Sequence, residues 1–363
     1  MQALNQRQLS LDAEATEIGQ QLAGCNLLLT GAPRLGDLLF ACPAIEYLCS
    51  GGTVRELTVL CFGYAAPILK GLTVDVKTIE FPTGSWNLIN KWRLTRTINR
   101  RNFDAAIVLD GKKSMRKLLE STNIPLVLVE ASTDTHKTEQ HFRSVLECFP
   151  TAGDWDDPRV TVPRIEVTQS ARARAFAKLQ TVGRPRVAFH VGCQRVNRKK
   201  LSYADVNRTA TKLWHVERFL ELGQKLINEF GATIIMVGSG SSERALAEEL
   251  SARLGPKCIN TVDWGDTMQT AALLQQTDTL VASDGGILHL GAAVGLKTIA
   301  VWGPTPLKVF GPCGPPERIR ILHKKVSCSP CKKSSCDDKI CLSSISAEEA
   351  LAAFGELIAT NNV

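Results

Sequence analysis

Short apolar runs alternate with helix-length segments along the whole chain, and this alternation constrains the fold more than any other feature. Continuous apolar strands separated by helices are typical of parallel sheets covered on both faces. The pattern predicts these strands: Asn26–Thr30, Leu57–Phe62, Val74–Ile79, Ala105–Leu109, Pro125–Val129, Arg186–Val191, Thr233–Val237, Thr279–Ala282, Thr298–Trp302 and Ile319–Leu322. The predicted fold class is therefore α/β, with doubly wound sheets.

A chain of 363 residues is too long for one ordinary core, which predicts two domains of similar architecture facing one another across a cleft. The link is expected near residues 156–166, where two prolines break the helical pattern. We expect an N-terminal extension over residues 1–24, a first domain over 25–160, a second over 161–345 and a C-terminal helix within 346–363.

The sequence argues against several classes of protein. No apolar run approaches the roughly 20 residues that cross a bilayer, and residues 1–24 lack the apolar core of a signal peptide. These two features predict a cytoplasmic protein. No G-x-G-x-x-G follows a predicted strand, which argues against a hydride-transferring dinucleotide enzyme.

The net charge of +7 is unevenly distributed. Eight basic residues and one acid lie between Arg184 and Lys212, and a second basic cluster lies at residues 324–333. Such clusters suit phosphate-bearing ligands, an anionic membrane surface or nucleic acid, and they also occur on ordinary solvated faces.

The loop after the first predicted strand, GAPRLGDLLFACPAIEYL, contains Asp37. Ligands of open α/β sheets bind outside the carboxyl ends of the strands, so this loop is expected to face a ligand. A carboxylate at that place is a candidate general base. The alternative is that Asp37 is the N-cap of the helix that follows it.

The stretch SDGGILHLGAAVGLKTIAVWGPT begins at the end of another predicted strand. The N–H groups of Gly285 and Gly286 would stand at a helix N-terminus with no side chain in the way, which predicts a diphosphate site. Asp284 carries the wrong charge for phosphate, so we expect it to cap the helix or to accept hydrogen bonds from a sugar. We expect His289 either to donate to the same anion or to be satisfied in the core.

Two further residues of the second half are candidates for the same ligand. Lys212, in TKLWHVERF, stands just before a helix expected to start near His215 and would place a positive charge opposite the diphosphate. Glu243 stands at the head of the helix after GSGS and is expected either to accept from a ribose hydroxyl or to cap that helix.

The segments RLGDLLFACPAI, KLWHVERF and DGGILHLGAAVGLKTIAVWGPT together resemble glycosyltransferase family 9, the bacterial heptosyltransferases of the lipopolysaccharide inner core. The resemblance spans roughly residues 25–359. It implies a GT-B fold, two Rossmann-like domains with the active site between them. It also implies an inverting, metal-independent transfer of heptose from ADP-heptose to a hydroxyl of the lipopolysaccharide inner core.

The resemblance carries roles over to individual positions. Asp37 would be the catalytic base, and Arg34 would contact phosphates of a lipid-linked glycan acceptor, with the enzyme peripheral to the inner membrane. The implied donor-binding residues are Lys212, Glu243, Asp284, Gly285, Gly286 and His289. Lys212 and the two glycine N–H groups would stabilise the departing diphosphate.

Three features depart from the family pattern. Gly285 stands where the family commonly has Ser or Thr, residues 190–192 read His-Val-Gly instead of His-Pro-Gly, and a long basic insert occupies residues 193–211. Two alternatives keep the fold: a heptosyltransferase acting on autotransporter-type proteins, and a catalytically silent nucleotide-binding relative. A nucleic-acid-binding protein would explain the charge but leaves Asp37 and the glycine pair without a purpose, so no nucleic acid is expected.

Four of the twelve cysteines form the pattern C-x2-C-x4-C-x4-C: Cys328, Cys331, Cys336 and Cys341. Four thiolates on one short loop suit a structural Zn or Fe, and free thiols or a redox-labile pair are the alternatives. The loop is similar to the iron-holding loop of relatives that glycosylate autotransporter proteins. Four other cysteines are expected to be small buried side chains: Cys42, Cys49, Cys61 and Cys148.

Overall fold

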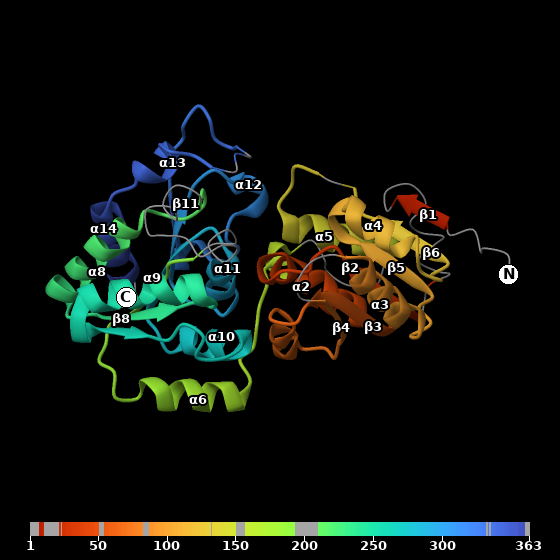
Figure 1. The fold of residues 1–363 in the computed structure, drawn as a ribbon, viewed down its shortest axis with the longest axis horizontal. Coiled ribbons are helices and arrows are strands. Elements are labelled where there is room, and N and C mark those ends of the chain that lie inside the picture. The colour runs from red at the N-terminus through yellow and green to blue at the C-terminus, as the bar shows by residue number, and fades with distance from the viewer. Residues whose placement is uncertain are drawn as a thin grey trace. The chain divides into compact units, whose positions relative to one another are not determined.

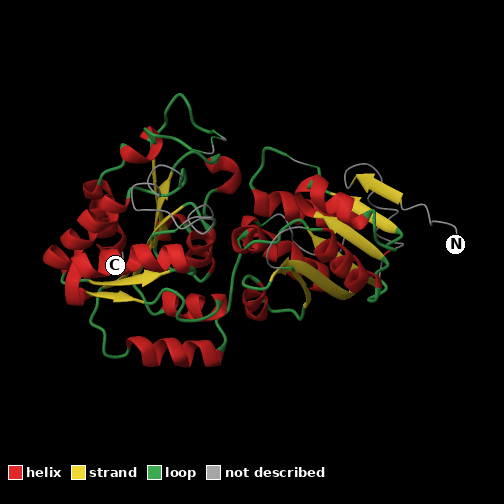
Figure 2. Ribbon diagram, viewed as in Figure 1, coloured by secondary structure: helices red, strands yellow, loops and turns green. Residues whose placement is uncertain are grey.

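The computed structural model describes residues 7–10, 22, 24–50, 54–82, 87–131, 133–149, 157–192, 210–331, 333 and 335–359. The chain divides into two compact units, Met1–Glu166 and Val167–Val363. Each unit is built on a sheet whose described strands pair in parallel, with helices on both faces (Figures 1 and 2). The predicted α/β class is therefore confirmed. Most of the basic insert, residues 193–209, lies outside the described residues.

The strands of the first unit are β1 (Arg7–Ser10), β2 (Cys25–Thr30), β3 (Val54–Phe62), β4 (Lys77–Phe81), β5 (Ala105–Val108) and β6 (Leu126–Val129). They lie in the order β1-β6-β5-β2-β3-β4. The chain leaves β2 and β5 toward opposite edges, so the topological switch point lies between these two strands. Residues 7–10, expected to be part of an extension, instead form the edge strand beside β6.

The helices of the first unit are α2 (Leu35–Cys49), α3 (Leu88–Asn99), α4 (Lys113–Leu119) and α5 (Lys137–Cys148), with short 3₁₀ helices η2 (Ala66–Gly71), η3 (Leu109–Gly111) and η4 (Pro158–Thr161). The side chains of α3 and α4 pack in one apolar cluster with alternate residues of the central strands. α2 and α5 pack against each other. Of the cysteines expected to be buried, Cys49 is only partly buried, whereas Cys42, Cys61 and Cys148 are buried.

The strands of the second unit are β7 (Arg186–His190), β8 (Thr233–Val237), β9 (Cys258–Asn260), β10 (Thr279–Ser283), β11 (Thr298–Trp302) and β12 (Ile319–His323). Their order is β12-β11-β10-β7-β8-β9, which is the 3-2-1-4-5-6 arrangement of a Rossmann sheet. Its switch point lies between β7 and β10, which pair with each other.

The helices of the second unit are α6 (Gln169–Leu179), α8 (Val216–Phe230), α9 (Ser241–Leu254), α10 (Thr267–Gln275), α11 (Gly286–Ala293), α12 (Leu307–Phe310), α13 (Ile340–Ser343) and α14 (Ala347–Ala359), with 3₁₀ helices η6 (Gly255–Lys257) and η7 (Pro316–Arg318). α8, α9 and α14 share the main apolar cluster with the sheet. Ser346 Oγ accepts from the Glu349 N–H while Glu349 Oε2 accepts from the Ser346 N–H, a reciprocal cap that starts α14 where the sequence predicted.

The length and hydropathy of the helices were compared with those of membrane spans. No helix in the described parts of the chain is both long and apolar enough to cross a bilayer.

Candidate functional site

Asp37 lies near the switch point of the first sheet. It is in the first turn of α2, whose N-cap is Arg34, so the alternative that Asp37 is itself the N-cap is wrong. The helix starts three residues earlier than the expected start at Leu38, because Leu35 is already helical and buried. A carboxylate in the first turn still complements the positive end of the helix dipole.

The carboxylate of Asp37 is held by charge rather than by hydrogen bonds. Its Oδ2 is buried and accepts no hydrogen bond from the described residues. Two cations lie just beyond hydrogen-bonding distance of this oxygen: Lys112 Nζ at 3.6 Å and Arg34 Nη1 at 3.9 Å. The two cations therefore flank this oxygen while its lone pairs remain available to accept a proton.

Lys112 connects the ends of the two central strands. Its ammonium donates to the Gly31 carbonyl after β2 at 2.6 Å and lies 3.4 Å from Asp110 Oδ2 after β5. Gly31 has φ 104°, and a Cβ there would come within 2.1 Å of the Leu109 carbonyl oxygen. Only glycine fits this close approach of the two strand ends. The sequence analysis missed Lys112, although its place directly after a strand end was a signal.

Asp110 is the centre of a second, more buried group of charges. Its Oδ1 lies 2.6 Å from the ammonium of Lys137, a side chain that is almost fully buried. Burial opposes ionisation of Asp110, but the hydrogen bond from Lys137 and the charges of His141, Lys137 and Lys112 outweigh it. The pKa of Asp110 is therefore lowered from its ordinary value of 3.8.

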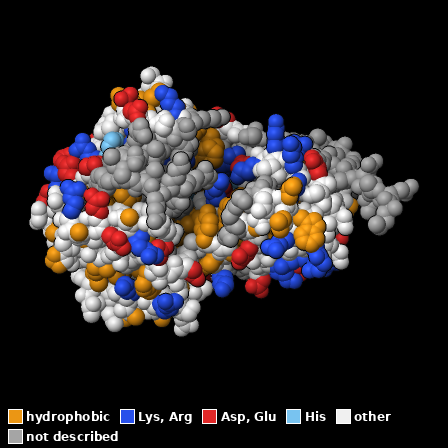
Figure 3. Space-filling model, viewed as in Figure 1, with side chains coloured by type: hydrophobic (Ala, Val, Ile, Leu, Met, Phe, Trp, Pro, Cys, Tyr) orange, Lys and Arg blue, Asp and Glu red, His pale blue; other side chains and the backbone are white. Residues whose placement is uncertain are grey.

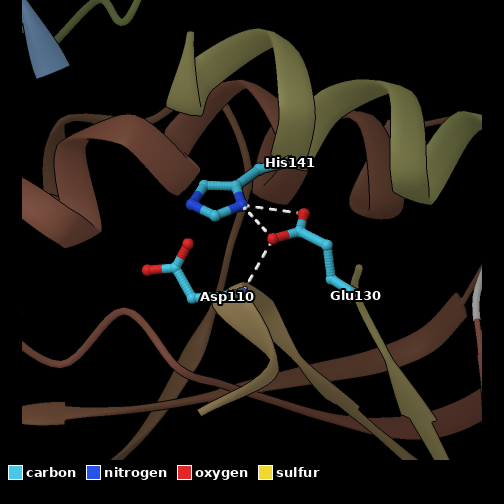
Figure 4. A group of neighbouring side chains, drawn as sticks. All are labelled: Asp110, Glu130 and His141. Atoms are coloured by element: carbon cyan, nitrogen blue, oxygen red, sulfur yellow. Dashed lines mark hydrogen bonds and ion pairs between the residues drawn. The ribbon is translucent and has the colours of Figure 1, made fainter. Parts of the chain in front are cut away.

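Asp110, Glu130 and His141 offer ligand atoms that all lie within 4.8 Å of one another (Figure 4). Hydrogen bonds within the protein already occupy the Glu130 and His141 ligand atoms. Glu130 Oε2 accepts from the Asp110 N–H at 2.8 Å and from Gln140 Nε2 at 2.9 Å, and Glu130 Oε1 lies 2.8 Å from His141 Nδ1. Because Lys137 supplies positive charge as well, we interpret the group as a charge network that fixes the loop after β5, not as a metal site.

The glycine pair of the second unit lies at the switch point of its sheet. Gly285 is the N-cap of α11 and Gly286 is its first residue, so the pair stands at a helix N-terminus, as the sequence predicted. No side chain caps this helix, so the expectation that Asp284 is the cap is wrong. The backbone N–H groups at this N-terminus form an arrangement that suits an anion.

Asp284 instead binds Lys212. Its Oδ2 lies 2.7 Å from Lys212 Nζ and accepts a hydrogen bond from Thr305 Oγ1 at 2.5 Å. Asp284 is almost fully buried, whereas the Lys212 side chain is 42% exposed. The structure therefore brings Lys212 to the end of β10 beside the glycine pair, and Asp284 holds it there.

Two hydrogen bonds fix the segment that carries Lys212. The Trp214 N–H donates to Ser283 Oγ at 2.8 Å, and the buried ammonium of Lys339 donates to the Leu213 carbonyl at 3.0 Å. Lys339 stands in the cysteine loop, so this loop supports the segment that carries Lys212. Its role was not predicted because the two residues are far apart in sequence.

Glu243 is buried at the start of α9. Its Oε2 accepts from the Ser239 N–H at 2.9 Å and lies 3.5 Å from His190 Nε2. A Cβ on Gly192 would come within 2.1 Å of Glu243 Oε1, and one on Gly238 within 2.4 Å of Oε2. The glycines after β7 and β8 thus make room for this carboxylate. The Ser239 N–H precedes Gly240, the N-cap of α9, so this contact fixes the segment before the helix, and the ribose role stays a prediction.

His289 lies one turn into α11. It is almost fully buried, and its ring meets the Trp302 ring edge to face, with centroids 6.4 Å apart. This packing agrees with the alternative that His289 belongs to the core. Its role as a hydrogen-bond donor to the bound anion stays a prediction.

The four cysteines of the loop do not converge on one point. Cys328 is exposed and Cys341 is buried. In the described chain, no three of the four sulfur atoms lie within 4.8 Å of one another, so their positions do not fit a formed tetrahedral site with metal–sulfur bonds of about 2.3 Å. Burial, and then the charges of Cys328, Cys331 and Cys336, raise the pKa of the Cys341 thiol, so the four are still electrostatic neighbours.

Comparisons with known proteins agree with the architecture. The model of glycosyltransferase family 9 (heptosyltransferase) matches residues 121–341, more than half of the chain. The lipooligosaccharide heptosyltransferase 2 of Haemophilus influenzae is 22% identical over 310 residues, which is 77% of this chain and 84% of that protein. E. coli ADP-heptose lipopolysaccharide heptosyltransferase II superposes with a TM-score of 0.69 at 16% identity, covering 93% of this chain and all of that one.

A further solved structure shares the fold. The iron-containing dodecameric glycosyltransferase TibC of enterotoxigenic E. coli superposes with a TM-score of 0.55 at 10% identity, covering 94% of this chain and 78% of that one. At this identity the match speaks for the fold alone.

Two Rossmann-like units with the strand orders described above match the GT-B fold of the solved heptosyltransferase. The chain belongs to glycosyltransferase family 9, because that family's model matches most of its second unit and part of its first.

Proposed function

We propose that the chain transfers a heptose from ADP-heptose to a hydroxyl of the lipopolysaccharide inner core, with inversion at the anomeric carbon. The names of the relatives support the reaction, since they are lipooligosaccharide and lipopolysaccharide heptosyltransferases. The observation that carries the proposal is the Asp37 carboxylate, whose buried Oδ2 lies between two cations and accepts no hydrogen bond from the described residues.

Asp37 is proposed as the general base. It takes the proton from the acceptor hydroxyl as that oxygen attacks the anomeric carbon, and the nucleoside diphosphate leaves from the opposite face. Lys112 is proposed as the positioning residue, because it ties the Asp37 loop to the ends of β2 and β5. Arg34, exposed at the N-cap of α2, is proposed to contact a phosphate of the acceptor.

The second unit is proposed to hold the donor. The N–H groups at the start of α11 and the ammonium of Lys212 bind the diphosphate and stabilise its charge as it leaves. Asp284 holds Lys212 in place through its 2.7 Å ion pair. Glu243 and His289 are proposed to contact the rest of the nucleotide. None of these roles uses a metal.

The acceptor is proposed to be a lipid-linked glycan, which would bring the enzyme to the inner membrane as a peripheral protein. The second candidate acceptor is a protein hydroxyl, favoured by the cysteine pattern, which resembles that of relatives that glycosylate autotransporter proteins. Metal analysis of protein purified without a histidine tag distinguishes a metal-bound cysteine loop from one with free thiols. One metal per chain, lost together with stability on chelation, supports a structural metal, and full stability without metal supports free thiols.

The test of the proposal is an assay of heptose transfer from ADP-heptose to heptose-deficient core lipopolysaccharide. Asp37→Asn should reduce the rate by about 10²–10⁴-fold, while calorimetric affinity for ADP stays near that of the wild type. Equal loss of transfer and of ADP affinity would contradict the assignment of Asp37 as base. Tighter binding of UDP, GDP or dTDP than of ADP would contradict the donor, and binding of ADP without any transfer would support the catalytically silent relative.

A further inference from the structure

Helix α3 of the first unit carries apolar side chains that nothing in the described structure covers. Leu88 is 86% exposed, Ile89 61% and Trp92 59%. Seven large apolar side chains are exposed in the described part of the chain, and three of them stand on this one helix. Scattered single exposures need no explanation, but a cluster on one helix indicates a contact surface.

The exposed cluster occupies one side of the helix. At 3.6 residues per turn, Leu88, Ile89 and Trp92 share a side with three arginines further along: Arg93, Arg96 and Arg100. The opposite side holds Leu94 and Ile98, which are buried in the apolar cluster beneath the helix. The fold of the first unit thus uses only the inner side of α3. We call the outer side, made by the six residues above, the α3 outer face.

The charge around the α3 outer face is basic. Residues 88–102 contain five basic side chains and no acid. The Arg96 guanidinium lies 5.3 Å from the centre of the Trp92 ring, so cation and aromatic ring form one surface. The neighbouring helix α4 adds two exposed lysines, Lys113 and Lys117. One acid, Glu80, lines the same shallow pocket as Arg93.

Figure 3 shows apolar side chains beside basic ones on the exposed surface over α3. Tryptophan and long aliphatic side chains enter the boundary between lipid headgroups and acyl chains, and adjacent arginines bind anionic headgroups while their own stems stay in the apolar layer. The sign of the charge complements an anionic leaflet, whose attraction contributes a binding increment for each basic residue near the surface.

We propose that the α3 outer face docks the protein on an anionic bilayer, with Leu88, Ile89 and Trp92 inserted at the headgroup level and the arginines bound to lipid phosphates. This inference goes beyond the proposed function, because it assigns a membrane-binding surface and depends on no particular sugar or nucleotide. It also adds a surface that the sequence did not predict, since Arg34 was expected to contact phosphates of the lipid-linked acceptor.

The test is co-sedimentation of the full-length protein with vesicles of phosphatidylcholine containing phosphatidylglycerol, compared with phosphatidylcholine alone. We expect binding to the anionic vesicles that weakens with salt. The triple variant Leu88→Ser, Ile89→Ser, Trp92→Ser should lose at least about tenfold in partition. Arg96→Glu should lose about fivefold or more. The matched control is Phe176→Ser, which changes a similarly exposed side chain on α6 of the second unit and should bind like the wild type.

Calorimetric ADP affinity of each variant distinguishes failure of this inference from failure of the proposed function. Wild-type ADP affinity together with lost vesicle binding supports the α3 outer face as the docking surface. Vesicle binding that survives the triple variant overturns the inference, even if heptose transfer is established. A different pair of results would also overturn the inference: the wild type binds no vesicles, and the triple variant loses self-association measured by sedimentation velocity. The α3 outer face would then be a protein interface.

Discussion

The two units place different chemistry at the same point of the same kind of sheet. After β2 and β5 the first unit gathers charged side chains, Asp37, Lys112 and Asp110, held by a buried network. After β7 and β10 the second unit exposes backbone at Gly285 and Gly286 and adds one lysine, Lys212. The strand order brings loops together at the switch point, and the residue types in those loops decide whether they suit proton transfer or anion binding.

If that division is correct, damage to the charged network should affect the first unit alone. Asp110→Asn removes the partner of buried Lys137 and should lower the free energy of unfolding by about 2–3 kcal/mol at pH 7. Urea unfolding measures this change, and calorimetric ADP affinity should stay unchanged. Glu139→Gln on α5 breaks an exposed pair with Arg143 and should cost below about 0.5 kcal/mol. Equal costs for the two variants would contradict the network.

The pH dependence sharpens the same test. The folded-state pKa of Asp110 is lowered below 3.8, so its contribution to stability is present above the unfolded pKa and is lost as pH falls through the folded pKa. The difference in unfolding free energy between wild type and Asp110→Asn should therefore shrink below about pH 4. A difference that stays constant from pH 6 to pH 2.5 would contradict the lowered pKa.

Lys112→Met tests the link between the network and Asp37. Without the Lys112 ammonium the Asp37 loop is no longer linked to the ends of the strands, so kcat for heptose transfer should fall between about tenfold and a hundredfold. The KM for ADP-heptose should change little, because the donor is bound by the second unit. Lys113→Met, on the exposed side of the same helix, is the matched control and should retain kcat. A rise in donor KM at constant kcat would assign Lys112 to donor binding instead.

Lys212→Ala makes the opposite change in the second unit. It removes a cation from the diphosphate site and leaves Asp284 as an uncompensated buried carboxylate, so ADP affinity should fall by about tenfold or more. Adding Asp284→Asn should recover part of the loss, because the repelling charge is gone. Lys225→Ala on α8, whose lysine pairs with Glu348, is the control. Unchanged affinity in Lys212→Ala would remove this lysine from the site.

The sequence predicted the central strands well, because buried parallel strands are continuous apolar runs. It missed the short edge strands β1 and β9, which have no such run. It placed Asp37, Lys212 and the glycine pair near strand ends but could not tell which partners they meet. Asp284 was misread as a cap because its lysine stands 72 positions earlier in the chain. Pairings over such separations follow from sheet order, which local patterns do not contain.

The smallest expected effect concerns Gly285, which stands where a hydroxyl side chain is common in the family. Its φ is −175°, an extended conformation that any residue adopts. A Cβ there would lie 3.7 Å from His190 Cε1, its nearest neighbour, which is an ordinary contact. Gly285→Ser should therefore fold normally and gain a few tenths of a kcal/mol from a side-chain N-cap.

A comparison of Gly285 with Gly192 tests whether the glycines at this edge of the second sheet have the same function. Gly192→Ala would force the Glu243 carboxylate to move and should lower both stability and ADP affinity. Gly285→Ser should leave ADP affinity equal to the wild type or raise it a few-fold, since the new hydroxyl points to the same helix N-terminus. Thermal unfolding and calorimetry measure both variants. A Gly285→Ser protein that binds ADP more weakly would mean that the anion needs the bare backbone at this position, and that the second unit binds it differently from relatives with a hydroxyl there.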